Sequence, residues 1–271
     1  AIALLLTAAL ALLLLLIGWL RPESGEGFYA YLSHTAMVAL FLPAFLLPML
    51  AVVLGLRRYW KQIGGERIRW SQVRAAVSDA LTLRNLSGGV GQGCQYEAGD
   101  RFSMARRIGH QLVLYGFLLA FASTSVATVM HYGFAMPAPY PLWSLPKLFG
   151  ISGGVALCIG CLMLLRLRAS ADPALGDQRS TQGDLGFVWL LFLVSASGLV
   201  LYAATGAAAV RWLLALHLGA VLAFFLLLPY SKMAHGFYRG MALIRDAQER
   251  EQVGRRQVRP ARTVGKQLSR S

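Results

Sequence analysis

The sequence predicts an all-α fold: a polytopic integral membrane helix bundle with about six transmembrane helices and both termini in the cytoplasm. Three observations support this class. Of the 271 residues, 56% are hydrophobic and 14% are charged, whereas soluble domains carry about 25% charged residues. The apolar residues gather in runs of about 18 or more, enough to cross a bilayer as a helix. Lys and Arg concentrate between alternate runs.

Six runs are long enough to span the hydrocarbon core. They lie at 2–20, 31–56, 109–134, 143–165, 185–204 and 210–235. A helix is expected for each run because it satisfies its own backbone hydrogen bonds in lipid. The alternating pattern of barrel strands does not recur along the chain. The sequence therefore predicts a transmembrane domain at 1–245 with a long connecting loop at 57–108.

The basic residues predict the orientation. Segments 57–108, 166–184 and 232–271 hold 23 of the 26 Lys and Arg, and the opposite connections hold three, Arg21, Lys147 and Arg211. The positive-inside rule places the 57–108 loop and both termini in the cytoplasm. The net charge of +14 is thus explained by topology, and no nucleic-acid partner is expected. The basic tail at 246–271 is expected to be loosely ordered, near anionic membrane lipids.

All five histidines lie in or at the ends of the predicted spans. The third span carries His110 and His131, and the sixth carries His217 and His235. If these helices pack antiparallel, His110 meets His235 on the cytoplasmic side and His131 meets His217 on the other. Imidazoles from two facing helices are the ligands of a six-coordinate b-type haem. The four histidines are therefore predicted metal ligands of two stacked haems in a cytochrome b-type domain.

Other residues near the histidines have more than one interpretation. His34 is an alternative ligand on the outer side, or a hydrogen-bond donor to a quinone. Four cations flank the inner pair and are expected to bind the haem propionates, although interfacial anchoring is the alternative; they are Arg106, Arg107, Lys232 and Arg239. Small residues near the ligands either admit a flat macrocycle or serve helix packing; they are Gly109, Gly116, Gly219 and Gly236.

The cysteines and the glycine-rich loop predict no further cofactor. Cys158 and Cys161 have C-x-x-C spacing inside an apolar span, where a zinc or iron–sulfur site would lack its other ligands, so packing is expected. The loop at 85–96 contains Cys94 and four glycines but lacks the Gly-Lys-Ser/Thr ending of a phosphate-binding loop.

Seven stretches resemble a known family. They are FYAYLSH at 28–34, LRNLSGGVGQGCQY at 83–96, ARRIGH at 105–110, ATVMH at 127–131, APYPLWSLP at 138–146, LHL at 216–218 and LPYSKMAH at 228–235. Together they resemble the membrane half of the tricarballylate/citrate-utilisation electron-transfer proteins (TcuB/CitB-like). The PYSKxxH ending also resembles, more distantly, the last haem helix of the nitrate reductase gamma-subunit cytochromes b.

The resemblance implies a multi-pass subunit of the bacterial inner membrane that belongs to a hetero-oligomeric oxidoreductase and is not itself catalytic. It would take electrons from a flavoprotein dehydrogenase or iron–sulfur donor and pass them through bis-His haem b to the quinone pool. Members of this family carry a cysteine-rich, ferredoxin-like segment that these 271 residues do not include. This difference keeps an alternative open: a structural or assembly subunit of a larger membrane redox or photosynthetic complex.

Overall fold

A computed structural model describes residues 2–20, 31–86, 96–97, 101–136, 138–170, 178–204 and 209–268. Eight α-helices occupy most of these residues. They are α1 Ile2–Leu20, α2 His34–Gln62, α3 Trp70–Leu81, α4 Ala105–Gly133, α5 Leu145–Ala169, α6 Gln178–Ala203, α7 Val210–Leu227 and α8 Lys232–Leu268. The strands described are two residues each, β1 Tyr96–Glu97 and β2 Arg101–Phe102, paired antiparallel.

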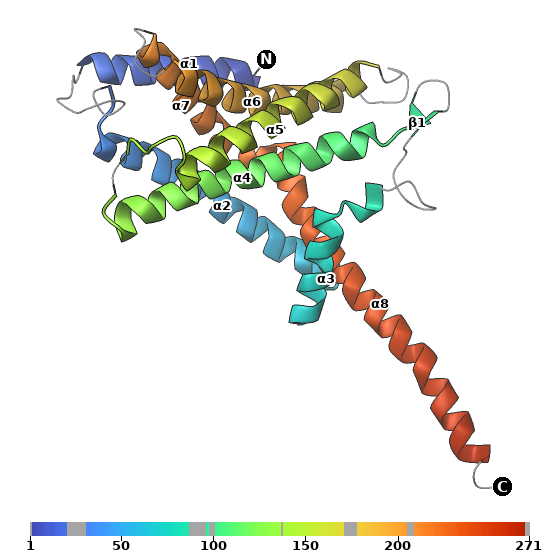
Figure 1. The fold of residues 1–271 in the computed structure, drawn as a ribbon. Coiled ribbons are helices and arrows are strands. Elements are labelled where there is room, and N and C mark those ends of the chain that lie inside the picture. The colour runs from blue at the N-terminus through green and yellow to red at the C-terminus, as the bar shows by residue number, and fades with distance from the viewer. Residues whose placement is uncertain are drawn as a thin grey trace.

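The fold class predicted from the sequence is confirmed. Six helices of the described chain, α1, α2, α4, α5, α6 and α7, are long and apolar enough to cross a membrane. In Figure 1, α4 and α5 lie side by side, α1, α6 and α7 lie above them, and α2 runs below toward α3. The inner faces of α2, α5, α6 and α7 meet in one buried apolar cluster that includes Val52, Leu157, Leu190 and Phe224. The protein is therefore a polytopic helical bundle.

The closest helix pair is held together by glycines. A Cβ on Gly116 of α4 would lie 2.7 Å from the backbone nitrogen of Leu157 in α5, and one on Gly153 of α5 would lie 2.8 Å from that of Ala120 in α4. Gly160 repeats this contact seven residues later, against Val113. Small residues at such spacing let two backbones approach closely in a membrane. This pairing makes α5, and not α7, the main partner of α4.

We expect Gly153→Leu to destabilise the bundle by about 3 kcal/mol, because the new side chain must push apart two backbones in contact. The measurement is reversible unfolding in detergent followed by helical circular dichroism. Gly186→Leu is the matched control, since a Cβ at Gly186 of α6 meets nothing within 4 Å. Equal stability of the two variants would contradict this account of the α4–α5 contact.

The predicted sixth span at 210–235 is wrong at its C-terminal end. α7 stops at Leu227, and a 3-10 turn, Leu228–Tyr230, follows it. The apolar span includes this turn and ends at Tyr230. Pro229 has no N–H to continue the helical hydrogen bonds. Ser231 then accepts a hydrogen bond from the Met233 N–H at 3.2 Å, and α8 begins. His235 therefore lies on a separate helix.

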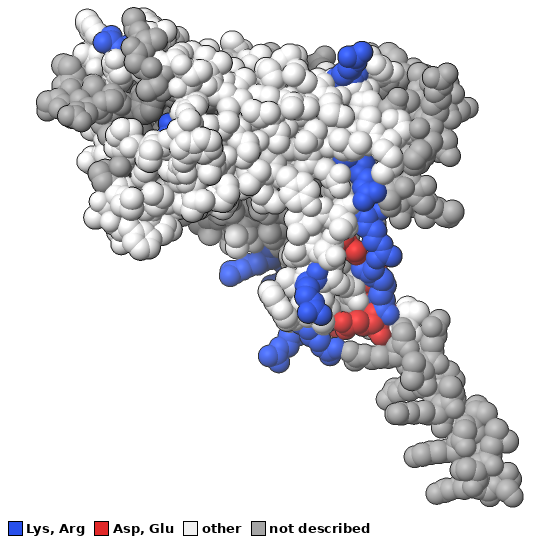
Figure 2. Space-filling model, in the orientation of Figure 1, with Lys and Arg blue, Asp and Glu red and all other residues white. Residues whose placement is uncertain are grey.

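Two helices, α3 and α8, were not expected from the sequence. The expected loop at 57–108 contains the end of α2 and all of α3, and the expected loosely ordered tail is helical through Leu268. α8 is stabilised by the i,i+4 ion pairs Arg245–Glu249 and Asp246–Arg250, at 3.2 and 2.9 Å. Figure 2 shows Lys and Arg gathered over this part of the molecule, below a bundle surface that is largely uncharged.

α3 is joined to α8 by polar contacts. The Gln248 amide donates to the Gln72 Oε1 at 3.3 Å, and both side chains are buried. Asp79 accepts from Arg250 of α8 at 2.9 Å and from Arg84 at 3.4 Å. Although burial opposes ionisation, these hydrogen bonds and positive charges lower the pKa of Asp79 below its ordinary value. Ionised Asp79 therefore stabilises the α3–α8 contact.

Because the pKa of Asp79 is lower in the folded protein, its stabilising contribution is present above the ordinary carboxyl pKa and is lost as the pH falls through the folded-state value. We expect Asp79→Asn to weaken the α3–α8 contact by about 1 kcal/mol at neutral pH. The measurement is amide hydrogen exchange over 70–81, with Asp246→Asn as control because Asp246 pairs with Arg250 within α8. If Asp79→Asn and the wild type still differ in exchange rate over 70–81 in acid, where Asp79 is protonated, the stabilising role of the ionised Asp79 is contradicted.

Candidate metal centre

In the structure the predicted inner pair lies near enough for the charge of His235 to act on His110. His110 lies near the start of α4 and His235 in the first turn of α8. Both imidazoles are exposed, and each lies within range of the other's charge. They come from helices that do not pack closely on each other, since α4 packs mainly on α5. The geometry thus leaves two imidazoles near each other without a tight helix interface between them.

The ring of His235 is held in the tautomer that a metal ligand needs. Its Nδ1 lies 3.0 Å from the Lys232 carbonyl oxygen. A carbonyl can only accept, so Nδ1 carries the proton and the Nε2 lone pair is left available. Histidines that ligate metals generally donate their other ring N–H to a carbonyl or carboxylate in this way. This contact is the detail that best fits His235 as an axial ligand.

The glycines near the ligands fall into two groups. A Cβ on Gly236, next to His235, would meet nothing within 4 Å, and the same is true of Gly240. This face of α8 is therefore open at Gly236 and Gly240. Gly109 and Gly116, in contrast, pack against α5, and a Cβ on Gly219 would lie 2.7 Å from a backbone atom of α1. Those three serve helix packing, which was the alternative interpretation.

The four cations differ in their surroundings. Arg106 lies within charge range of His110. Arg107 donates to the Thr82 carbonyl at 2.8 Å, while its Nε is buried without a hydrogen-bond partner. A buried donor of this kind fits an anionic ligand such as a propionate. Lys232 and Arg239 are exposed on α8. Propionate binding by these four side chains stays a prediction.

On the outer side, the structure brings His131 to His34. Their rings stack with centroids 4.8 Å apart and an interplanar angle of 19°. The Tyr132 hydroxyl lies 3.3 Å from His34 Nε2, and its ring stands edge-on to His131 at 4.7 Å. An iron ligated by both imidazoles would require these stacked rings to separate. Tyr132 was missed by the sequence analysis, although it follows His131 directly.

His217 lies against α6. Its Nδ1 is 3.1 Å from the Ser197 hydroxyl, and a Cβ on Gly198 would lie 2.9 Å from its ring. Ser197 gave no sequence signal because a serine inside an apolar span usually bonds its own helix, as Ser197 also does to Leu193 at 2.6 Å.

The register of α4 and α7 separates His131 from His217 in depth. Phe117 and Phe224 contact each other, with ring centroids 5.8 Å apart. From that level His131 is 14 residues outward on α4, or about 21 Å, and His217 is 7 residues outward on α7, or about 10 Å. Two axial ligands of one iron must lie at the same depth. The register therefore favours His34 over His217 as the partner of His131, and the ligand assignment stays a prediction.

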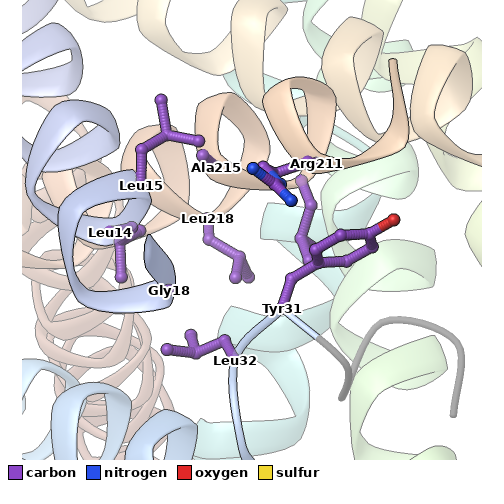
Figure 3. A pocket seen from close by; sticks show the side chains of 9 residues that line it. Leu14, Leu15, Gly18, Tyr31, Leu32, Arg211, Ala215 and Leu218 are labelled. Atoms are coloured by element: carbon purple, nitrogen blue, oxygen red, sulfur yellow. The ribbon is translucent and has the colours of Figure 1, made fainter. Parts of the chain in front are cut away.

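Two cations assigned to the outer side contact tyrosine rings. Figure 3 shows Arg211 beside Tyr31, and its guanidinium lies 5.5 Å from the ring centroid. The Lys147 ammonium lies 4.0 Å from the Tyr202 ring centroid. The cavity beside Arg211 is lined by leucines of α1 and α7 and holds ≈ 20 Å³, room for about one water molecule. It is too small for a haem or a quinone.

The remaining candidate groups do not form a metal cluster. In the part of the chain that the structure describes, no three His, Cys, Asp or Glu side chains come together. A haem iron needs only two protein ligands, since the porphyrin supplies the other four. Cys161 is fully buried and Cys158 Sγ lies 3.3 Å from the Ser195 hydroxyl, as expected for packing residues. Cys94 and the glycines around it lie outside the described residues.

Comparisons with known proteins point to one family. Residues 1–256 match the family model described as citrate utilization protein B. A curated Escherichia coli protein, described as "Citrate utilization protein B", is 40% identical over 231 residues. This alignment covers 85% of the chain and 61% of that relative, so the chain spans less than two thirds of the relative's length. No solved structure matches the chain.

Proposed function

Because the chain belongs to the citrate utilization protein B family, we propose that it is the membrane electron-transfer component of a citrate- or tricarballylate-utilisation system. It passes electrons from a flavoprotein or iron–sulfur donor to quinone as a non-catalytic subunit of a larger complex.

The observation that carries this proposal is the arrangement at His235. Its Nδ1 is bonded to the Lys232 carbonyl, its Nε2 is available, and the neighbouring face at Gly236 is open. His110 supplies the second imidazole within charge range. These two residues hold haem b on the inner side, and His131 with His34 holds a second one on the outer side. When bound, haem iron carries one electron at a time.

The orientation follows from the charge distribution. With 23 of 26 Lys and Arg on one side, that side faces the cytoplasm of a bacterial inner membrane. α3 and α8 lie on the same side as the inner histidines and present the basic surface seen in Figure 2. A positive surface at the electron-entry side attracts an acidic donor protein and accelerates its association.

The proposal is tested by the reaction of the purified chain with quinone. The protein is reduced with dithionite, freed of excess reductant without oxygen, and mixed with a short-chain quinone in a stopped-flow spectrophotometer. The ferrous haem b spectrum is expected to disappear as the quinone is reduced, and His235→Ala, which keeps only the outer haem, is expected to lose about half of this signal. A chain that purifies with haem but stays reduced in the presence of quinone would contradict the assignment of quinone as acceptor.

A further inference from the structure

A large apolar groove lies between α1, α2 and α7. Its volume is ≈ 570 Å³, within the range of about 300–1,000 Å³ typical of small-molecule sites. Its walls are mainly leucines from the three helices, among them Leu13, Leu47 and Leu222. In Figure 1, α2 runs away from α1 and α7 toward α3. The groove is many times larger than the cavity beside Arg211.

The sequence of α2 explains the shape of this groove. Pro43 and Pro48 lie inside the helix and both line the groove. A proline in a helix interior removes one backbone hydrogen bond and bends the helix. Pro48 also leaves the carbonyl of Ala44, another lining residue, without its helical donor. Both prolines of α2 therefore lie along one wall of the groove.

The chemistry of the walls specifies a neutral amphiphile. Among the described residues that line the groove there is no Lys, Arg, His, Asp or Glu. The polar side-chain atom is the hydroxyl of Tyr230, in the turn where α7 ends, and this side chain is 87% exposed. A phospholipid would place its phosphate best beside cations. A neutral ring with hydrogen-bonding oxygens and a long apolar tail matches the groove better.

We propose that this groove binds a prenylated quinone, with the ring at Tyr230 and the tail along the leucines of α1, α2 and α7. This inference rests on the proposed function and adds the location of the acceptor site. Tyr230 precedes His235 by five residues, so the ring lies on the side of the inner histidine pair. Two electrons from the reduced donor, arriving one at a time, and two protons from water convert the bound quinone to the quinol. The Tyr230 hydroxyl donates a hydrogen bond to a ring carbonyl.

The test is photolabelling of the full chain in lipid nanodiscs with an azido-substituted prenylquinone, followed by peptide mapping. Label is expected on 40–51 and 222–230, and unlabelled quinone is expected to compete with it. Leu47→Trp fills the groove and is expected to lower labelling about tenfold, equivalent to about 1.4 kcal/mol. Leu50→Trp is the matched control, since Leu50 lies outside the groove on the same helix with similar exposure, 55% against 65% for Leu47.

Tyr230→Phe keeps the ring and removes the hydroxyl, so labelling is expected to fall about 3- to 10-fold. Label in the groove of a protein that shows no haem signal would support quinone binding in the groove and contradict the proposed electron-transfer function. Label elsewhere, in a protein whose haem still reacts with quinone, overturns the groove and leaves the proposed function intact. Equal effects of Leu47→Trp and Leu50→Trp, or competition by phospholipid instead of quinone, would make the groove a lipid site and overturn the proposal.

Discussion

His235→Ala is expected to remove the inner haem while the helical bundle stays folded. The imidazole is exposed and packs into no core, so its loss costs the fold little, whereas a six-coordinate haem loses one of its two protein ligands. His110→Ala is expected to have the same effect. The measurement is the pyridine haemochrome content of purified protein, which should fall from about two haems per chain to about one. Circular dichroism and gel filtration report whether the fold is kept.

A ligand exchange separates loss of a ligand from general damage at this site. His235→Met keeps an axial ligand, so haem is expected to stay bound with a higher reduction potential. Unchanged haem content in His235→Ala and His110→Ala would contradict the assignment of these two histidines as ligands of the inner haem. If electron transfer in the intact complex is unchanged while its assembly suffers, the alternative of a structural or assembly subunit gains.

The outer histidines give the second large effect. His131→Ala and His34→Ala are each expected to remove the outer haem, because the rings of His131 and His34 are stacked, with centroids 4.8 Å apart. His217→Ala is expected to keep it, since His217 lies about 10 Å deeper than His131 by the register of the two phenylalanines. Haem content and redox titration of the three variants decide between the partners. Loss of haem in His217→Ala but not in His34→Ala would restore the pairing expected from the sequence.

The fold class was predictable because it depends on long apolar runs. Each predicted span contains one membrane-length helix of the structure, although the sixth span was drawn past its end into α8. The family expected from the sequence motifs is the one that the comparisons identify. The close α4–α5 pairing was harder to foresee, since Gly109 and Gly116 look alike whether they admit a cofactor or a neighbouring helix. Only the position of α5 distinguishes the two uses.

The missed features depend on contacts between distant segments. α3 has a short, mixed sequence, and it is stabilised by Gln248 and Arg250, more than 170 residues away. The break before α8 has a local signal in Pro229, but His235 lies close enough to that proline to look like part of the same span. The outer pairing depends on the level at which Phe117 meets Phe224, which no spacing within a single helix reveals.

The most direct test of the central claim is the haem stoichiometry of the purified wild-type chain. The account predicts about two haems b per chain, with a low-spin spectrum typical of two histidine ligands on each iron. The protein should be expressed with sufficient haem supply and purified in mild detergent, so that an empty site reflects the protein and not the preparation. A folded, monodisperse chain that contains no haem would contradict the claim that its histidines form an electron path.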